Sequence, residues 1–194
     1  MTTLAGVRAR VRLRLEETIE AIWSDDTIDE TIQASLEEYN HLFPKEERLP
    51  VAHPGGTESI ALDSDTVGVV RVVLANGWTV PRRSLASGSP AGETLAWEWF
   101  AGALHFSQPV DAQSVDVWRF TPRSLEEVPE WDVGLLVLGS VWRTLQQRSV
   151  QEVKRGLLLS SLADRSVVRS AEREYTRALN LRRRRVRSRV MEAL

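Results

Sequence analysis

The sequence predicts an α+β fold in which a helical bundle carries an inserted antiparallel β domain. Apolar residues recur at helical spacing towards both ends of the chain, whereas the middle holds valine-rich and aromatic runs between turn residues. The strongly apolar segment 133–142 needs more covering surface than one helix pair supplies. We therefore expect residues 1–49 to form the N-terminal helix pair of the bundle, 50–125 the β domain, and 126–194 the central and long C-terminal helices that complete the bundle.

Two amphipathic helices are expected at the N-terminus, over about Leu4–Ala21 and Asp25–Phe43. Ser24 is a typical N-cap residue, and Pro44 disfavours helical geometry at the residue before it. In the first helix arginines precede glutamates, opposite to the order that its own dipole favours. The expected apolar stripes are Leu4, Val7, Val11, Leu15, Ile19 and Ile22 in the first helix, and Ile28, Ile32, Leu36, Tyr39 and Phe43 in the second.

The middle of the chain is expected to begin with a loop, "PVAHPGGTE", and to continue as β hairpins. The valine-rich run "VGVVRVVL" precedes Asn76-Gly77, a pair that favours a type I′ turn, and "WTVPRRS" is the expected return strand. "TLAWEWF" and "ALHFSQPV", joined by Ala101-Gly102, predict a second hairpin, and "SVDVWRF" a further strand. Trp97 and Trp99 share a sheet face, which indicates aromatic packing, with a ligand-stacking site as the alternative.

Helices are expected to resume at "VPEWDVGLLVLGSVWRTLQQR", with Pro129 in the first helical position. This run is apolar almost all round, which is typical of a central helix covered on every side, and Gly134 and Gly139 would let neighbours approach its backbone. The segment 150–194 reads as a long amphipathic helix that is basic at its end. A break near Ala163-Asp164 is expected, because Asp164 could cap a second piece.

Residue types with catalytic or metal-binding chemistry are scarce. The chain has no cysteine and three histidines, and it contains no nucleophile elbow, phosphate-binding glycine loop or metal-spaced His/Glu set. We therefore expect no enzyme activity, cofactor or metal, although an acid/base pair assembled from distant positions stays open. The longest apolar run is shorter than the roughly 20 residues that span a bilayer, and the N-terminus lacks a secretory signal, so a soluble cytoplasmic protein is expected, without a membrane partner.

Charge is strongly separated along the chain although the net charge is only −2. Residues 16–47 carry 11 acidic side chains and one lysine, and residues 165–189 carry 10 arginines and two glutamates. One interpretation is two solvated helix faces of opposite sign. The other is a chain that meets further copies, or a partner, through complementary surfaces.

Several motifs follow one another along the chain: "RVRLRLEE", "WSDDTIDETIQASLEEYNHLFP", a β-rich insert, "VPEWDVGLLVLGSVWRTL", and a basic terminal helix containing "EREYTRALN". Their order resembles that in the head-tail connector, or adaptor, proteins of tailed bacteriophages. In that family an arginine- and leucine-rich first helix leads into a Trp-Ser-Asp cap and an amphipathic helix that ends in tyrosine. An apolar helix and a long C-terminal helix follow. Trp23-Ser24-Asp25 and Tyr39 carry the resemblance most specifically, and the β insert is larger than the family pattern requires.

The resemblance implies a structural protein of the virion neck, made in the bacterial cytoplasm, that forms a ring, commonly a dodecamer, below the portal. The ring would join the portal protein to a downstream tail or stopper protein, and DNA would pass through its channel without specific recognition. The terminal helix would bind the portal through Tyr175, Leu179, Arg182, Arg183, Arg184, Arg185, Val186, Arg187, Arg189 and Val190. The subunit interface would use Glu30, Glu37, Glu38, Arg8 and Arg12, which combines the resemblance with the charge separation.

A nucleic-acid-binding protein is the alternative. Its phosphate-contacting helix would be "NLRRRRVRSRV", which is basic enough to bind DNA without sequence preference. The overall pI near 6.0 and the lack of a recognisable reading motif favour the connector interpretation.

Overall fold

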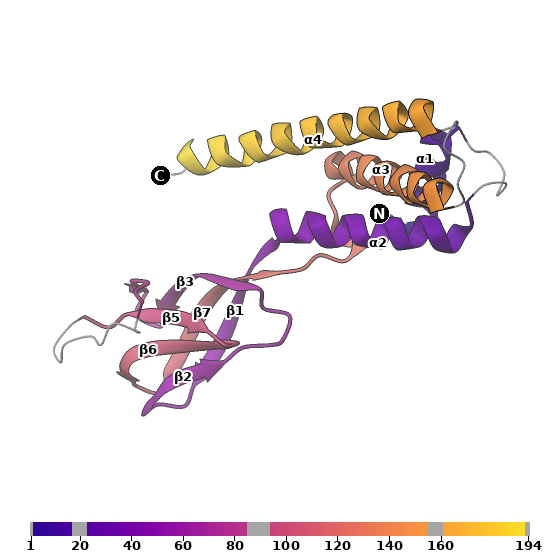
Figure 1. Cartoon of the computed structure of the whole chain (residues 1–194). Coiled ribbons are helices and arrows are strands. Elements are labelled where there is room, and N and C mark those ends of the chain that lie inside the picture. The colour runs from indigo at the N-terminus through magenta and orange to yellow at the C-terminus, as the bar shows by residue number, and fades with distance from the viewer. Residues whose placement is uncertain (1, 17–22, 85–93, 155–160, 193–194) are drawn as a thin grey trace. The chain divides into compact units, whose positions relative to one another are not determined.

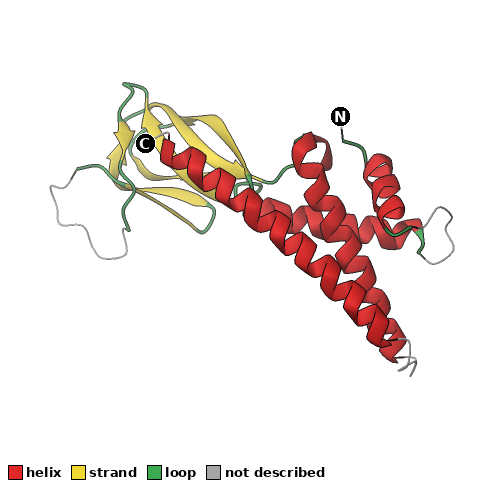
Figure 2. Ribbon diagram, turned by 90° about the horizontal axis from the view of Figure 1, so that it is seen from above, coloured by secondary structure: helices red, strands yellow, loops and turns green. Residues whose placement is uncertain are grey.

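The protein is α+β, with four α-helices and antiparallel sheets among the residues described by the computed structural model (Figure 1). These described residues are 2–16, 23–84, 94–154 and 161–192. The chain divides into two compact units, which we call the helical unit (Met1–Tyr39 and Ser124–Leu194) and the β unit (Asn40–Arg123). Figure 2 shows that the helices and the strands are segregated between the two units.

The first helix, α1, spans Leu4–Arg14 and is shorter than the sequence predicted. The side-chain oxygen of Thr3 accepts a hydrogen bond from the Gly6 amide at 3.2 Å and caps its start. The helix ends because Glu16 adopts a left-handed conformation, with φ of 57°. Arg12 and Arg14 therefore lie in the last turn, where the helix dipole favours positive charge, and the expected conflict with the dipole was wrong. Ile19 and Ile22 lie outside the described residues.

The second helix, α2, spans Asp25–Leu42, close to the prediction. Ser24 Oγ accepts from the Thr27 amide at 3.1 Å, which confirms the N-cap. Asp25 and Asp26 occupy its first turn. The predicted apolar stripe is buried at Ile28, Ile32, Leu36, Tyr39 and Phe43.

The C-terminal helices are α3, Glu130–Lys154, and α4, Ser161–Glu192, after a short 3-10 helix at Leu125–Glu127. Helix α3 starts one residue after Pro129, so this proline precedes the helix. The expected break near Ala163-Asp164 was wrong, because α4 is continuous there. Asp164 is the fourth residue of α4, and near a helix start a carboxylate is favoured without ending the helix.

Helix α3 is the centre of the helical unit, but it is not covered on every side as expected. Leu136 is buried with 1% of its surface exposed, whereas Trp131, on another face, is 77% exposed. A Cβ added at Gly139 would lie 3.1 Å from Ser35 Oγ, which confirms close approach there. A Cβ at Gly134 would meet nothing within 4 Å, so the expected close approach at that glycine was wrong.

The β unit contains a four-stranded sheet, ordered β1-β7-β3-β4, and a three-stranded sheet, ordered β2-β6-β5. All strand pairs are antiparallel. A shared cluster of buried residues, including Val72, Leu104 and Val117, draws on both sheets. The strands are β1 (Lys45–His53), β2 (Thr57–Ala61), β3 (Gly68–Leu74), β4 (Thr79–Val80), β5 (Trp97–Phe100), β6 (Ala103–Val110) and β7 (Gln113–Thr121).

Strand β1 begins five residues before Pro50, and "PVAH" belongs to it, so the loop expected to open the β region was wrong at its start. Half-buried and exposed residues alternate along β1, as in a strand with one covered face. Pro50 is tolerated because β1 is an edge strand, where a missing amide hydrogen breaks no ladder on the outer side. The turn that follows contains Gly55 and Gly56, both with positive φ.

The hairpin between β3 and β4 differs from the expected type I′ turn. Only Gly77 has a positive φ, of 81°, and its amide donates to the Leu74 carbonyl at 2.9 Å. A three-residue loop therefore connects the strands, with glycine in the left-handed position. The return strand is limited to β4, although a single parallel bridge joins Arg82 to Trp97.

The second hairpin and the last strand are confirmed. Strands β5 and β6 pair across Ala101 and Gly102, both with positive φ, and β7 covers the predicted run. Trp97 is buried in the core cluster and Trp99 packs against it, so the shared sheet face and the aromatic packing are confirmed.

The first and last residues of the β unit, Asn40 and Arg123, are joined by hydrogen bonds. Asn40 Nδ2 donates to the Arg123 carbonyl at 2.9 Å, and the Arg123 amide donates to Asn40 Oδ1 at 2.9 Å. This reciprocal pair satisfies both backbone groups of Arg123.

Candidate functional site

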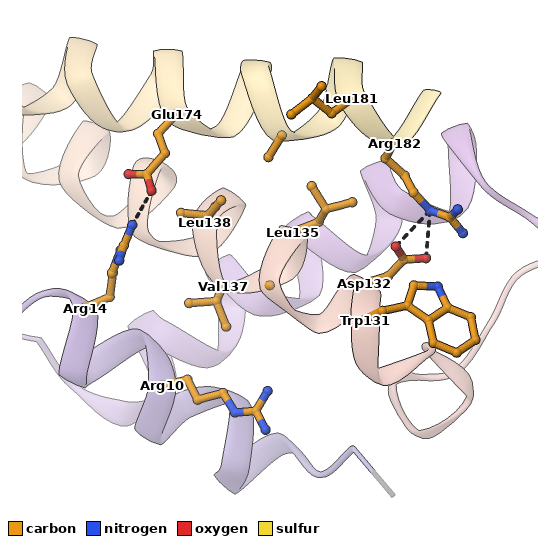
Figure 3. Close-up of a pocket in the computed structure, with 12 residues that line it drawn as sticks. Arg10, Arg14, Trp131, Asp132, Leu135, Val137, Leu138, Glu174, Leu181 and Arg182 are labelled. Carbon is orange, nitrogen blue, oxygen red and sulfur yellow. Dashed lines mark hydrogen bonds and ion pairs between the residues drawn. The ribbon is translucent and has the colours of Figure 1, made fainter. Parts of the chain in front are cut away.

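A groove of about 490 Å³ lies between α1, α3 and α4 of the helical unit (Figure 3). Its apolar surface comes mainly from α3, together with Ala178 and Leu181 of α4. Trp131 is 77% exposed and Leu181 is 50% exposed, although both are large apolar side chains. Exposed apolar side chains gathered around a groove are typical of a surface that binds another molecule. The residues that α3 contributes are Trp131, Asp132, Gly134, Leu135, Val137 and Leu138.

The sequence of α3 explains why the groove is open at this point. Gly134 lines the groove and contributes no side chain, and a Cβ at this position would meet nothing within 4 Å. Leu138, on the same helix, is only partly covered and lines the groove as well. The run that looked apolar all round therefore has one side that other described residues cover only in part.

The charged side chains at the groove pair with one another. Arg10 donates to Glu130 at 2.7 Å, and Arg14 donates to Glu174, as the dashed line in Figure 3 marks for the second pair. These pairs join α1 to α3 and α1 to α4. Their charges cancel, so the groove is suited to an apolar segment with few charges of its own.

Asp132 and Arg182 form the most buried of these ion pairs. Arg182 Nε lies 2.8 Å from Asp132 Oδ1, and the Asp132 side chain is 2% exposed. Tyr39 donates its hydroxyl hydrogen to the same carboxylate at 2.8 Å. Asp132 therefore connects α2, α3 and α4, which fixes the end of the groove (Figure 3).

A second polar cluster joins the same helices further along. Glu38 accepts hydrogen bonds from Arg143 at 2.5 Å and from the Tyr175 hydroxyl at 2.8 Å. Burial opposes ionisation of Glu38, but these hydrogen bonds outweigh burial and lower the pKa of its carboxyl. Burial, with the neighbouring Glu38 carboxylate, raises the pKa of Tyr175. Trp142 stacks on the Tyr175 ring, with 5.7 Å between centroids.

Three of the five expected subunit-interface residues have partners within the chain. Arg8 pairs with Asp25 and Asp29, in each case at 2.5 Å, and Arg12 pairs with Asp25 at 2.7 Å. The hydrogen bond from Arg12 lowers the pKa of Asp25, and the hydrogen bond to Asp29 raises that of Arg8. Glu38 is the third. Only Glu30 and Glu37, which are exposed, keep the placement expected of residues that contact another subunit.

The expected portal-binding residues of α4 fall into three groups. Tyr175 and Leu179 are buried in the helical unit and Arg182 binds Asp132, so these three side chains make contacts within their own chain. Arg183 and Arg184 are exposed. The side chains of the remaining five lie outside the described part of the structure: Arg185, Val186, Arg187, Arg189 and Val190.

The β unit holds a charge cluster that the sequence analysis missed. Arg119 of β7 has a side chain that is 7% exposed, and it pairs with Glu47 at 2.7 Å, Asp65 at 2.9 Å and Asp63 at 3.1 Å. Burial opposes ionisation of Arg119, but the carboxylates outweigh burial and raise its pKa. The sequence did contain a signal for this cluster. Arg119 follows Val115 and Val117 at the two-residue spacing of β7, and these valines face the core, so Arg119 is a charged residue at a buried position.

Neither a metal centre nor a membrane-spanning helix occurs in the described residues. No group of three or more His, Cys, Asp or Glu side chains in the described ranges is arranged to hold a metal ion. No helix there is both long and apolar enough to cross a membrane.

A scan against protein-family models and a search of curated proteins both found no match to the chain.

Proposed function

We propose that this protein is a structural head-tail connector of a tailed bacteriophage, a ring subunit that joins the portal to the tail. The observation that carries the proposal is the combination, on one helical unit, of an open apolar groove with the arginine-rich end of α4. The order of the sequence motifs supports the same family. A structural role also agrees with a site that offers apolar surface and paired charges.

The end of α4 is suited to reach a partner. Arg182 contacts Asp132 near the start of α3, and α4 continues to Glu192, ten residues further (192 − 182). At a rise of 1.5 Å per residue this extension is about 15 Å long. The sequence of this extension is rich in arginine, and clustered basic residues favour contact with an acidic or mixed surface such as that of a portal protein.

The groove is suited to a protein segment. A groove of about 490 Å³ has room for several side chains, and its charged residues are already paired. An apolar stretch of a neighbouring subunit or of the portal would cover Trp131 and Leu181, which are otherwise exposed.

Native mass spectrometry and negative-stain imaging test this function directly. The purified full chain is measured alone and mixed with the portal protein encoded by the same genome. We expect a closed ring, formed by the chain alone or on the portal. A chain that stays monomeric under both conditions would overturn the proposal.

Two variants assign the attachment to the groove and to the end of α4. Replacing Trp131 and Leu181 by serine should weaken binding to the portal, whereas the matched change Leu13→Ser should not, because Leu13 is 76% exposed but does not line the groove. Truncation after Arg184 removes most of the arginine-rich end of the chain and retains the Arg182–Asp132 pair. We expect it to remain folded and to lose attachment.

A nucleic-acid-binding protein is the second candidate. Arg183 and Arg184 are exposed at the start of the basic end of α4, as phosphate contacts would require. Salt-dependent binding of duplex DNA by the full chain, lost on truncation after Arg184, together with no binding to the portal, would favour this candidate.

A further inference from the structure

Helix α2 carries a row of exposed carboxylates, which we call the acidic stripe: Asp26, Glu30 and Glu37. Their spacing of four and seven residues places all three within about 40° of one another at 100° per residue. The buried residues of α2, such as Ile28 and Tyr39, lie on the opposite side of the helix. The acidic stripe extends over eleven residues, which is about 16 Å of helix.

Helix α4 carries a matching row of exposed arginines, which we call the basic stripe: Arg169, Arg173, Arg177 and Arg184. The spacing of four, four and seven residues keeps them within about 80° of one another. Tyr175 and Leu179, which pack into the helical unit, lie on a different side of α4. The basic stripe extends over about 22 Å of helix.

Several other charged residues of the helical unit form ion pairs within it, whereas, among the described residues, the two stripes do not. Arg8, Arg12, Arg143 and Arg182 each bind a carboxylate of the same chain. In contrast, none of the seven stripe residues forms an ion pair with another residue in the described part of the chain. Two rows of opposite charge and similar length therefore remain available for contacts outside the chain.

We propose that the basic stripe of one copy binds the acidic stripe of a second copy of this chain. The acidic stripe and the basic stripe lie on two different helices, and each faces away from the buried residues of its own helix. A copy that uses its acidic stripe with one neighbour therefore keeps its basic stripe for another, which is a head-to-tail contact that continues from copy to copy. This inference deepens the proposed function and rests on it, because it names the contact between ring neighbours.

Charge complementarity favours a second copy over nucleic acid as the partner. The acidic stripe and the basic stripe belong to the same small unit, so the acidic stripe would repel a phosphate backbone brought close to it, whereas it provides the second copy with a partner surface. Exposed ion pairs contribute little affinity individually, so the stripes mainly set the register and the rate of association, and apolar contacts supply the remaining affinity.

A charge-swap experiment tests the contact. The first variant carries Glu30→Lys with Glu37→Lys, and the second carries Arg173→Glu with Arg177→Glu. Asp26 is unchanged, because it lies in the first turn of α2, where the helix dipole favours a carboxylate. Self-association of the full chain is measured by analytical ultracentrifugation at low and high salt, and circular dichroism verifies that each variant is folded.

We expect each variant alone to self-associate about tenfold more weakly than the wild type at low salt, since facing stripes then carry like charges. Mixing the two variants should restore assembly, because each then presents the opposite charge to the other. A control matched to the first variant, Glu58→Lys with Asp111→Lys, makes the same change in net charge as that variant at exposed positions of the β unit and should assemble as the wild type does.

The failures of the two proposals can be distinguished. If rings form on the portal but neither variant alters self-association, or if the mixture is not restored, the stripe contact is wrong and the connector function stands. Competition by duplex DNA for the basic stripe, with no copy-to-copy assembly in any sample, would also overturn the stripe contact. If no sample forms rings on the portal while the mixed variants still associate, the stripe contact stands and the connector function fails.

Discussion

Tyr175 donates its hydroxyl hydrogen to Glu38 at 2.8 Å, and this bond joins α4 to α2 at a partly buried position. Arg143 of α3 binds the same carboxylate oxygen, so one side chain from each of three helices meets at Glu38. Because charge-assisted hydrogen bonds in such a setting are stronger than neutral ones, the cluster fixes how α4 lies on the helical unit.

Removing the hydroxyl of Tyr175 should destabilise the helical unit moderately. Tyr175→Phe keeps the stacking on Trp142 and deletes only the hydrogen bond to Glu38. We expect the free energy of unfolding to fall by about 1.5–3 kcal/mol, the range for a hydrogen bond to a charged group. Urea unfolding followed by circular dichroism measures this loss, and an unchanged midpoint would show that the bond contributes nothing to stability.

The stability of the helical unit should decrease in acid, in part through Glu38. The folded state lowers the pKa of Glu38, so this carboxyl binds a proton more weakly in the folded than in the unfolded chain. Its contribution is therefore fully present above the ordinary pKa of about 4.3 and is lost as the pH falls through the lowered value. Urea midpoints at a series of pH values from 7 to 3 should fall for the wild type, and less steeply for Glu38→Gln.

The two glycines of α3 should respond in opposite directions. Gly139→Val places atoms against Ser35 and Tyr175, and we expect a loss of about 1–3 kcal/mol from overpacking. Gly134→Ala adds a methyl group in open space and removes the conformational freedom of glycine, which should stabilise the helix by about 0.5–1 kcal/mol. Thermal unfolding of both variants tests this, and equal shifts of the same sign would contradict the packing around Gly139.

Arg119→Met should destabilise the β unit strongly. The change leaves Glu47, Asp63 and Asp65 close together without their shared cation. Loss of one partner of a buried ion pair costs about 3–5 kcal/mol, but Asp63 and Asp65 are more than half exposed, so solvent screening reduces the expected loss to about 2 kcal/mol. Arg119→Lys should lose less, because it keeps the charge and gives up only the forked geometry. Denaturant unfolding followed by tryptophan fluorescence measures both, and a wild-type midpoint for Arg119→Met would refute the role of the cluster.

Local patterns in the sequence predicted much of the fold. The helix start at Ser24 and the hairpin at Ala101-Gly102 follow from residues that are close neighbours in the chain, and both are confirmed. The Asn76-Gly77 turn failed, because the asparagine keeps a negative φ and a longer loop with the same dipeptide serves equally well. The predicted end of α1 was wrong, because the spacing of apolar residues does not reveal that a residue such as Glu16 adopts a left-handed conformation.

The candidate site was much harder to predict from the sequence. The groove depends on the absence of a side chain at Gly134 and on two other helices that lie beside it, so no single segment encodes it. The pairing of Arg182 with Asp132 joins positions fifty residues apart. Charge patterning indicated that α2 and α4 carry opposite signs, but it could not separate charges used within the chain from those left exposed.

The reciprocal hydrogen bonds between Asn40 and Arg123 hold the two ends of the β unit next to each other. Its two points of attachment are adjacent, so a short linker could join them with little loop-closure entropy, and the helical unit would lose no strand or helix of its own. An insertion of this kind can be exchanged or lost during evolution without other changes to the helical unit. The helical unit can then stay the same while selection changes the β unit.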